Sequence, residues 1–426
     1  MIAAPPPAIV APSPPSSAPA AYLTQIRWTP AVGGRAPLVA VLDTGVDPNA
    51  PALAGAVVAD RARSFAPESP DPLVDGEGHG THVASTIARV AAGRGRQGVR
   101  ILPVTIAAPD GTTTPGSLAR GVRYAAAQGA RVINISFGGE GFSRVEQNAI
   151  NAASRSGAVV VVAAGNNGRT GGPPEYPGAY TQVMAVAGLG ANGRALALSS
   201  RGPQIALAAP GEDIAVPRAG GGTESRTGTS MAAAVVSGVA TRIIARRPGL
   251  SAAQVRTVLE TTAVDVPPRG RDVSTGMGAV DLRAALAVRR PPREDAEPND
   301  DTVLAADLPP LLAEGGPNAA TVDGRTGSWG DPRDGFRAYL RAGELLDARL
   351  RGPAQSDFDL VVWRVGTTAG ERTRAFGARW VAGASLGPTS NEHLTLVATR
   401  AGYYTVEVQG GRAPGAYRLT VRRRAG

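Results

Sequence analysis

Between about residues 36 and 290, short apolar runs alternate with stretches of helical periodicity. The apolar runs that predict strands lie at residues 38–42, 99–106, 131–135, 159–163 and 183–187. The helical patterns lie at residues 79–90, 117–128, 144–154, 230–246 and 251–261. Strands that are apolar at consecutive positions are buried on both faces, so the alternation predicts an α/β fold with a parallel sheet and helices on both sides. In such sheets, functional residues gather at the carboxyl ends of the strands.

The pattern changes near residue 290. Residues 289–298 are charged, contain prolines and lack periodicity, which predicts a linker. Beyond it, apolar and polar residues tend to alternate, notably at residues 358–363, 394–397, 403–408 and 417–421. This period of two predicts that residues 299–426 form an all-β sandwich. At the other end, seven prolines fall within the first 20 residues; residues 1–35 are therefore predicted to be a Pro-rich disordered arm, and residues 36–288 the α/β domain.

Composition narrows the chemistry that the chain can perform. It has no cysteine, all 44 of its Lys+Arg residues are arginine, and its three histidines are His79, His82 and His393. Without cysteine or lysine there is no thiol nucleophile, thiolate metal site, disulfide or Schiff base. Hydroxyl nucleophiles, carboxylates and a small pool of imidazole bases remain.

The formal net charge of +9 raises the question of a nucleic-acid partner. The arginines are scattered, and no basic run is longer than residues 422–424. Scattered arginine favours solubility and weak adhesion to anionic surfaces over specific readout, so no nucleic-acid partner is predicted. The longest clear apolar run, residues 158–164, is far shorter than the ~18 residues that a membrane-spanning helix needs.

Three segments place a reactive side chain at the end of a predicted strand or the start of a predicted helix. Asp43 directly follows the first apolar run, where a lone aspartate more often caps a turn. His79 begins a helical pattern, and the helix dipole disfavours its cationic form. Ser230 opens a helix of small residues, so its backbone N–H can point at a reacting oxygen, although an N-cap is the commoner role of such a segment.

Alternatives exist for the histidine and for the acid. His79 and His82 have i,i+3 spacing and lack the glutamate of a helical zinc site, so no metal is predicted there. Asp47 and Asp75 are also candidate partners for His79, yet neither directly follows a predicted strand.

In order along the chain, residues 39–47, 76–84 and 228–234 resemble the three motifs of the subtilisin-like serine proteases, the subtilase family. Residues 132–139 are similar to the substrate-pairing strand of this family, and residues 161–166 to its oxyanion-hole loop. The resemblance covers most of the α/β domain and implies the subtilisin-like fold. It also implies a serine endopeptidase that cleaves proteins or peptides, requires no cofactor and is monomeric.

The resemblance implies a role for each residue of the site. Ser230 attacks the peptide carbonyl, His79 accepts its proton, Asp43 orients His79, and Asn166 holds the oxyanion together with the Ser230 amide. The expected substrate-binding residues are Ser136, Phe137, Gly138, Gly139 and Glu175.

Glu175 carries an expectation about specificity. In the resembled family, the residue before a Tyr-Pro-Gly segment lies at the base of the pocket for the side chain that precedes the cut, and here Tyr-Pro-Gly occupies residues 176–178. A carboxylate there favours arginine or lysine in the substrate. An outward orientation of Glu175, or a pair with Arg169, is the alternative, and Glu140 is a second acid that would act on a neighbouring subsite.

The sequence departs from the family pattern at several positions. Ala234 stands where proline is common, and residues 91–98 are arginine-rich where many members bind calcium. The turn at residues 190–192 also lacks an acid, so no calcium is predicted in residues 1–290. The acidic stretch at residues 297–301 offers carboxylates to calcium, but a solvated linker is the preferred interpretation.

The second domain resembles the pre-peptidase C-terminal domain of secreted bacterial proteases. The segments that carry this resemblance are residues 297–301, 334–340, 357–362 and 402–408. Its role as a substrate or surface attachment module, or as a removable appendage, stays open. The two resemblances imply an extracellular protein, although no signal peptide pattern is visible. The alternative function is a catalytically inactive subtilase-fold protein that serves as a binding or surface-attachment scaffold.

Overall fold

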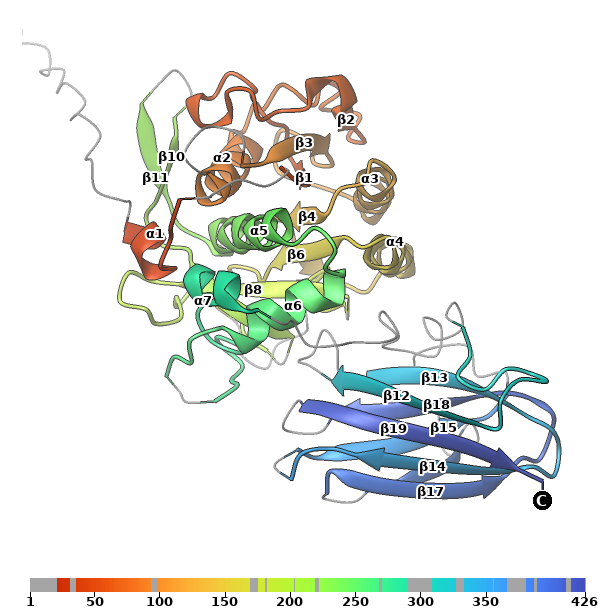
Figure 1. The fold of residues 1–426 in the computed structure, drawn as a ribbon. Helices are drawn as coiled ribbons and strands as arrows, with labels where there is room; N and C mark the ends of the chain where they lie inside the picture. Colours follow the sequence, from red (N-terminus) through yellow and green to blue (C-terminus); the bar gives the residue numbers. More distant parts are fainter. Residues whose placement is uncertain are drawn as a thin grey trace, which may run out of the picture.

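The structure is a computed structural model of the chain (Figure 1). It describes residues 21–30, 36–92, 98–168, 175–180, 182–202, 204–218, 222–267, 270–289, 309–326, 333–354, 356–365, 381–386, 389–410 and 415–425.

A seven-stranded parallel sheet forms the centre of the first part of the chain, in the order β2-β3-β1-β4-β6-β8-β9. Its strands are β1 Leu38–Asp43, β2 Arg63–Ser64, β3 Arg100–Thr105, β4 Val132–Ile135, β6 Val159–Ala163, β8 Val183–Leu189 and β9 Ile205–Pro210. The predicted α/β fold with a parallel sheet is confirmed. The apolar runs do not single out β9 or the hairpin formed by β10 Ile214–Pro217 and β11 Thr223–Arg226.

Helices cover both faces of this sheet (Figure 1). The main helices are α2 His79–Ala91, α3 Pro115–Ala127, α4 Arg144–Arg155, α5 Thr229–Arg246, α6 Ala252–Thr261 and α7 Leu282–Ala287. Strand β1 shows why its sequence is apolar at consecutive positions. Val39 and Val41 face the layer that contains α2 and α5, whereas Ala40 and Leu42 face α3 and α4. Both faces of the strand are therefore buried.

The structure of residues 21–30 corrects the prediction of a disordered arm at residues 1–35. Residues 21–25 form helix α1 (Ala21–Gln25), and Ile26 is fully buried in the core beside α2. The Trp28 indole donates a hydrogen bond of 2.9 Å to the carbonyl oxygen of Val90. The arm prediction is wrong for residues 21–30, because large apolar side chains follow the last proline of the cluster and pack against the sheet domain. Residues 1–20 and 31–35 lie outside the described residues.

The last part of the chain is all-β, as predicted. Two four-stranded antiparallel sheets have the orders β12-β19-β14-β17 and β13-β18-β15-β16. Their strands are β12 Ala319–Thr326, β13 Arg333–Leu340, β14 Leu345–Arg351, β15 Phe358–Trp363, β16 Val381–Ser385, β17 Asn391–Val397, β18 Gly402–Gly410 and β19 Gly415–Arg424. One apolar core joins residues of both sheets, which makes the region a sandwich. The predicted linker at residues 289–298 lies outside the described residues except for Arg289.

Among the helices that the structure describes, none has the length and apolarity needed to cross a bilayer.

We expect the substitution Ile26→Ala to lower the free energy of unfolding by about 2–5 kcal/mol, because it removes buried methylene groups and leaves a cavity. Denaturant unfolding measures this change. Thr24→Ala, at an exposed position of the same segment, is the control and should shift stability by less than about 0.5 kcal/mol. Equal stabilities of the two variants would contradict the docking of this segment.

Candidate active site

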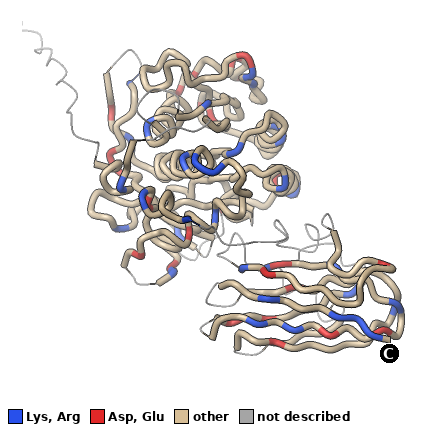
Figure 2. The backbone as a smooth tube through the Cα atoms, in the orientation of Figure 1, with Lys and Arg blue, Asp and Glu red and all other residues tan. Residues whose placement is uncertain are grey.

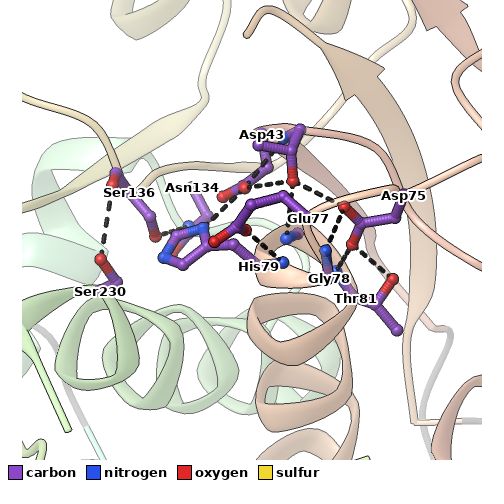
Figure 3. A network of polar contacts seen from close by, with 11 residues as sticks. Asp43, Asp75, Glu77, Gly78, His79, Thr81, Asn134, Ser136 and Ser230 are labelled. Carbon is purple, nitrogen blue, oxygen red and sulfur yellow. Dashed lines mark hydrogen bonds and ion pairs between the residues drawn. The ribbon is translucent and has the colours of Figure 1, made fainter. Parts of the chain in front are cut away.

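Strand β1 and helix α2 bring Asp43 and His79 into contact (Figure 3). Asp43 is the last residue of β1, and His79 is the first residue of α2. The Oδ1 atom of Asp43 lies 2.7 Å from Nδ1 of His79. Gly80 permits this close approach, since a Cβ at that position would lie 2.0 Å from the carbonyl oxygen of Gly45 and 2.9 Å from the Asp43 Cβ.

The Asp43 side chain is fully buried, with 0% of it exposed. The backbone N–H of Thr44 donates a hydrogen bond to its Oδ1 at 2.9 Å. Within the described part of the chain, its Oδ2 atom has no hydrogen-bond partner. A buried carboxylate with so few donors needs a compensating charge, and a protonated His79 supplies it.

Two opposing effects set the protonation of His79. Burial disfavours the imidazolium, but the charge and hydrogen bond of Asp43 outweigh burial, aided by Glu77 and Asp75, and raise the pKa of His79 from 6.5 to about 9. Because the folded-state pKa is raised, the pair stabilises the fold fully below the unfolded pKa of 6.5. This contribution is lost as the pH rises through about 9.

The other candidate acids have different partners. Asp75 accepts hydrogen bonds from the Thr44 hydroxyl at 2.8 Å, the Gly78 amide at 2.9 Å and the Thr81 amide at 2.7 Å (Figure 3). It thus braces the turn that leads into α2. Asp47 accepts hydrogen bonds from the Asn49 backbone and side chain. Of the three aspartates, Asp43 is the one that the structure places against the His79 ring.

His82, the second histidine of the motif, belongs to a separate contact. Its Nε2 atom lies 3.2 Å from Oε1 of Glu224 on the β10–β11 hairpin. Burial, and after it the charge of Arg226, lowers the pKa of His82. This shift favours the neutral ring, whose contact with Glu224 anchors the hairpin beside α2.

Residues that ligate metals do not cluster in the part of the chain that the structure describes, where no group of three or more His, Cys, Asp or Glu side chains is found. In the turn at residues 190–192, the carbonyl oxygens of Gly190 and Ala191 accept hydrogen bonds from Nε2 of Gln25, at 3.1 and 2.9 Å. Most of the arginine-rich loop at residues 91–98 lies outside the described residues.

Ser230 stands in the first turn of α5, and the His79 ring lies between it and Asp43 (Figure 3). Its hydroxyl donates a hydrogen bond of 3.4 Å to the carbonyl oxygen of Ser136. Helix α5 is buried from its start, because its first residues are small enough to pack inside the protein. The Ser237 hydroxyl fixes the helix against β4 through a 2.8 Å bond to Oδ1 of Asn134.

Thr229 orients the side chain of Asn166. From the sequence, the segment around Thr229 and Ser230 indicates only a helix cap. The Thr229 amide and hydroxyl both donate to Oδ1 of Asn166, at 2.9 and 3.0 Å. The Thr229 hydroxyl also accepts a 3.2 Å bond from the Gly165 amide. Since Oδ1 is occupied by two donors, Nδ2 of Asn166 is turned away from Thr229, and it has no partner among the described residues.

The predicted substrate-binding segment lies at the edge of this site. Residues 136–138 follow β4 without joining a strand, and residues 139–140 form β5 (Gly139–Glu140), which pairs with β7 (Glu175–Tyr176). The Phe137 ring stands edge-on to the His79 ring, with centroids 6.0 Å apart. Residues 136–138 are not paired with another strand, and such an edge is one to which an extended peptide can add.

The Glu175 carboxylate lies beneath the loop that carries Asn166. A Cβ on Gly165, whose φ is +103°, would lie 2.2 Å from Oε2 of Glu175, and a Cβ on Gly138 would lie 3.7 Å from the same atom. Ser200 donates a 2.6 Å hydrogen bond to Oε1, and Asn167 donates one of 3.1 Å. The side chain is buried and points inward; Arg169 lies outside the described residues.

Comparison with known proteins identifies the class to which this fold and site belong. The model of the subtilase family matches residues 34–278, more than half of the chain. The chain therefore belongs to the subtilase family, and the predicted resemblance of its first domain is confirmed.

Individual relatives agree with this assignment. Thermitase of Thermoactinomyces vulgaris is 38% identical over 249 residues, which cover 57% of this chain and 86% of thermitase. Fervidolysin of Fervidobacterium pennivorans is 37% identical over 297 residues, which cover 62% of this chain. The solved structure of sphericase matches with a TM-score of 0.55 and 30% identity over 61% of this chain and 97% of sphericase.

The matches do not extend over the full length of the relatives. The chain spans 42% of fervidolysin and 65% of subtilisin E of Bacillus subtilis.

A histidine titration followed by NMR tests the Asp43–His79 contact. We expect a midpoint near 9 for His79 and a clearly lower midpoint in an Asp43→Asn variant, because burial is then opposed only by the weaker effects of Glu77 and Asp75. Asp47→Asn is the matched control and should leave the His79 midpoint unchanged. A pKa near 9 in the Asp43→Asn variant would contradict the origin of the shift.

Proposed function

We propose that the protein is a serine endopeptidase in which Asp43, His79 and Ser230 form the catalytic triad. The observation that carries the proposal is the 2.7 Å contact between Asp43 and His79 with Ser230 on the far side of the imidazole, in a chain of the subtilase family (Figure 3). The substrates are proteins or peptides, and catalysis requires no cofactor.

The contact with Asp43 sets the tautomer of His79. The neutral ring keeps its proton on Nδ1, where it donates to the carboxylate, so Nε2 is the acceptor that takes the Ser230 proton during attack on the peptide carbonyl. The imidazolium that forms is stabilised by Asp43 and then gives its proton to the leaving amine. Because His79 must be neutral to act as a base and its pKa is raised to about 9, kcat/KM rises with pH through the alkaline range.

Asn166 stabilises the oxyanion of the tetrahedral intermediate. Thr229 occupies its Oδ1 atom with two hydrogen bonds, so Nδ2 is free to donate to the developing charge, together with the Ser230 amide at the start of α5. A donor that is already oriented before the reaction contributes more than one that must reorganise, and loss of one such donor typically lowers kcat by about 10²–10³-fold.

The substrate binds in extended form along residues 136–139. Its backbone pairs with the open edge that follows β4, and the side chain before the cut enters beside Gly138 and Gly165. Glu175 lies under both glycines, so its carboxylate favours an arginine or lysine side chain in this pocket through a charge-assisted hydrogen bond.

The alternative is an inactive subtilase-fold protein that serves as a scaffold. A scaffold has no need of a buried carboxylate aimed at a histidine, or of an asparagine amide held by two donors, so these contacts favour the enzyme. In this proposal residues 36–288 are the catalytic domain, and residues 299–426 form a pre-peptidase C-terminal-like sandwich after a linker. The protein acts outside the cell as a monomer.

Labelling with a fluorophosphonate probe separates the enzyme from the scaffold. We expect one covalent adduct on Ser230, located by peptide mass spectrometry, because an activated serine reacts with this probe and an ordinary serine does not. The Ser230→Ala variant must remain unlabelled, and Ser237→Ala, at a buried serine of the same helix, must keep the adduct if it folds. Absence of labelling in folded protein, alongside a reactive control protease, would establish the scaffold.

Peptide libraries that differ only in the residue before the cut test Glu175. We expect the parent protein to cleave after arginine with a higher kcat/KM than after leucine. In Glu175→Gln this arginine-to-leucine ratio of kcat/KM should fall by about 10–100-fold, because a hydrogen bond to a charged group contributes about 1.5–3 kcal/mol. The control Glu140→Gln changes an exposed acid on the paired strand and should leave this preference intact. Equal cleavage after leucine and arginine by the parent protein would refute the role of Glu175 without affecting the triad.

A further inference from the structure

The outer face of one sheet of the sandwich carries six arginines. Along β19, Tyr417, Leu419 and Val421 point into the core, so the alternate positions point outward. The same alternation applies to β12 and β14. The outward arginines of these three strands are Arg325, Arg349, Arg351, Arg418, Arg422 and Arg424, and this set is called the arginine face below.

Strand pairing brings these side chains together from distant parts of the sequence. Arg422 lies opposite Asp347, and Arg418 lies opposite Arg351. Residues two apart on a strand are about 7 Å apart, and neighbouring strands are about 4.8 Å apart, so the guanidinium groups form a close two-dimensional array. Figure 2 shows basic positions repeated along β19 and β14.

Acidic groups neutralise only part of this array. Asp323 binds Arg418 through two hydrogen bonds, of 2.6 and 2.8 Å. The buried carboxylate of Asp347 is shared by Arg349 at 3.1 Å, Arg424 at 3.8 Å and His393 at 3.0 Å. These contacts hold the arginine side chains in place.

The remaining three arginines of the face, Arg325, Arg351 and Arg422, have no ion-pair partner among the described residues. Like charges directly opposite each other destabilise a sheet. Asp323 offsets the charge of Arg418 but not that of Arg351, which lies opposite it. A bound anion neutralises the guanidinium groups that remain.

The residues between the arginines indicate the chemistry of the ligand. Thr321 and Thr420 share a 3.1 Å hydrogen bond on this face, and Thr395 and Asn391 on β17 are exposed. These groups are hydrogen-bonding partners for hydroxyls. Guanidinium groups bind carboxylate and sulfate oxygens through two parallel N–H donors.

Other polyanions fit this face less well. The outward positions on the four described strands carry no Phe, Tyr or Trp, and the His393 ring is held by Asp347. The face therefore lacks the row of stacking platforms that single-stranded nucleic acids use. A flat sheet face also does not enter a groove of duplex DNA. The large apolar side chains at outward positions of these strands, Leu345 and Val397, lie together at one end, which is little surface to insert into a lipid bilayer.

From these observations we infer that the arginine face is a binding surface for a linear acidic polysaccharide, whose sugars carry carboxylate or sulfate groups beside free hydroxyls. The polymer lies across β12, β19 and β14, and its acidic groups bind Arg325, Arg351 and Arg422. This surface is separate from the triad and does not depend on the proposed peptidase activity.

The test measures binding of the full chain, carrying Ser230→Ala to prevent self-digestion, to polygalacturonate at several salt concentrations. We expect binding that weakens by more than tenfold between 50 and 200 mM salt (on the order of three counterions released). The variant Arg325→Gln/Arg351→Gln/Arg422→Gln should bind at least about tenfold more weakly, with a shallower salt dependence. Far-UV circular dichroism and denaturant midpoints verify that each variant is folded.

The matched control carries Arg100→Gln/Arg123→Gln/Arg283→Gln, which removes the same charge from exposed positions of the α/β region. It should bind as the parent does. Equal weakening in both triple variants would show that only net charge matters and would overturn the inference. Equal binding of fully methyl-esterified polygalacturonate would overturn it too. Duplex DNA or phosphatidylglycerol vesicles could also bind more tightly than polygalacturonate. If the arginine-face variant loses that binding, the face binds this other polyanion and the inference is overturned.

Discussion

The arrangement of the candidate site depends on one buried charge, the carboxylate of Asp43. It ends a strand that is covered on both faces, and none of its side chain reaches solvent. Such a group is tolerated only beside a cation or several donors, and helix α2 provides His79 for this purpose. The absence of a side chain at Gly80 lets the helix start within contact distance. Asp75 holds the intervening turn through the Thr44 hydroxyl and the Thr81 amide.

Helix α5 completes the site by carrying two residues with different tasks. Ser230 lies on the other side of the His79 ring from Asp43 (Figure 3). The preceding Thr229 donates two hydrogen bonds to the side-chain oxygen of Asn166. The helix packs through small residues and is anchored to β4 by the contact between Ser237 and Asn134. Ser230 and Thr229 thus share one rigid element, so the helix sets the position of the serine relative to the threonine that orients Asn166.

In the sandwich, many charged side chains lie on the outer face of a sheet rather than in a buried site. Each outward pair of residues on β19 and β14 contains at least one arginine. The buried Arg423 instead turns inward to bond the carbonyl oxygens of Ala313 and Tyr339. The sandwich core is a closed apolar layer, so its stability does not require the outward charges. Their excess therefore points to a ligand outside the fold.

The sequence by itself determined the elements and the order of the motifs. The apolar runs and helical spacing marked β1, α2, β4, β6 and α5, because periodic burial is a local property of the chain. Asp43, His79 and Ser230 each stand at a strand end or a helix start, but it was the resemblance of their three motifs, in order, to the subtilase family that singled them out. The sequence did not predict the helix at residues 21–25, because the high proline content of the first 20 residues indicated a disordered arm.

Only the tertiary structure decided which groups touch. Sequence left Asp43, Asp47 and Asp75 as candidates for His79, and the 2.7 Å contact selects Asp43. The direction of the Asn166 amide depends on Thr229, 63 residues away. Likewise, Asp323 and Arg418 meet across 95 residues and bring scattered arginines onto one face. Such contacts arise from strand order and register, and short stretches of sequence do not encode which distant strands become neighbours.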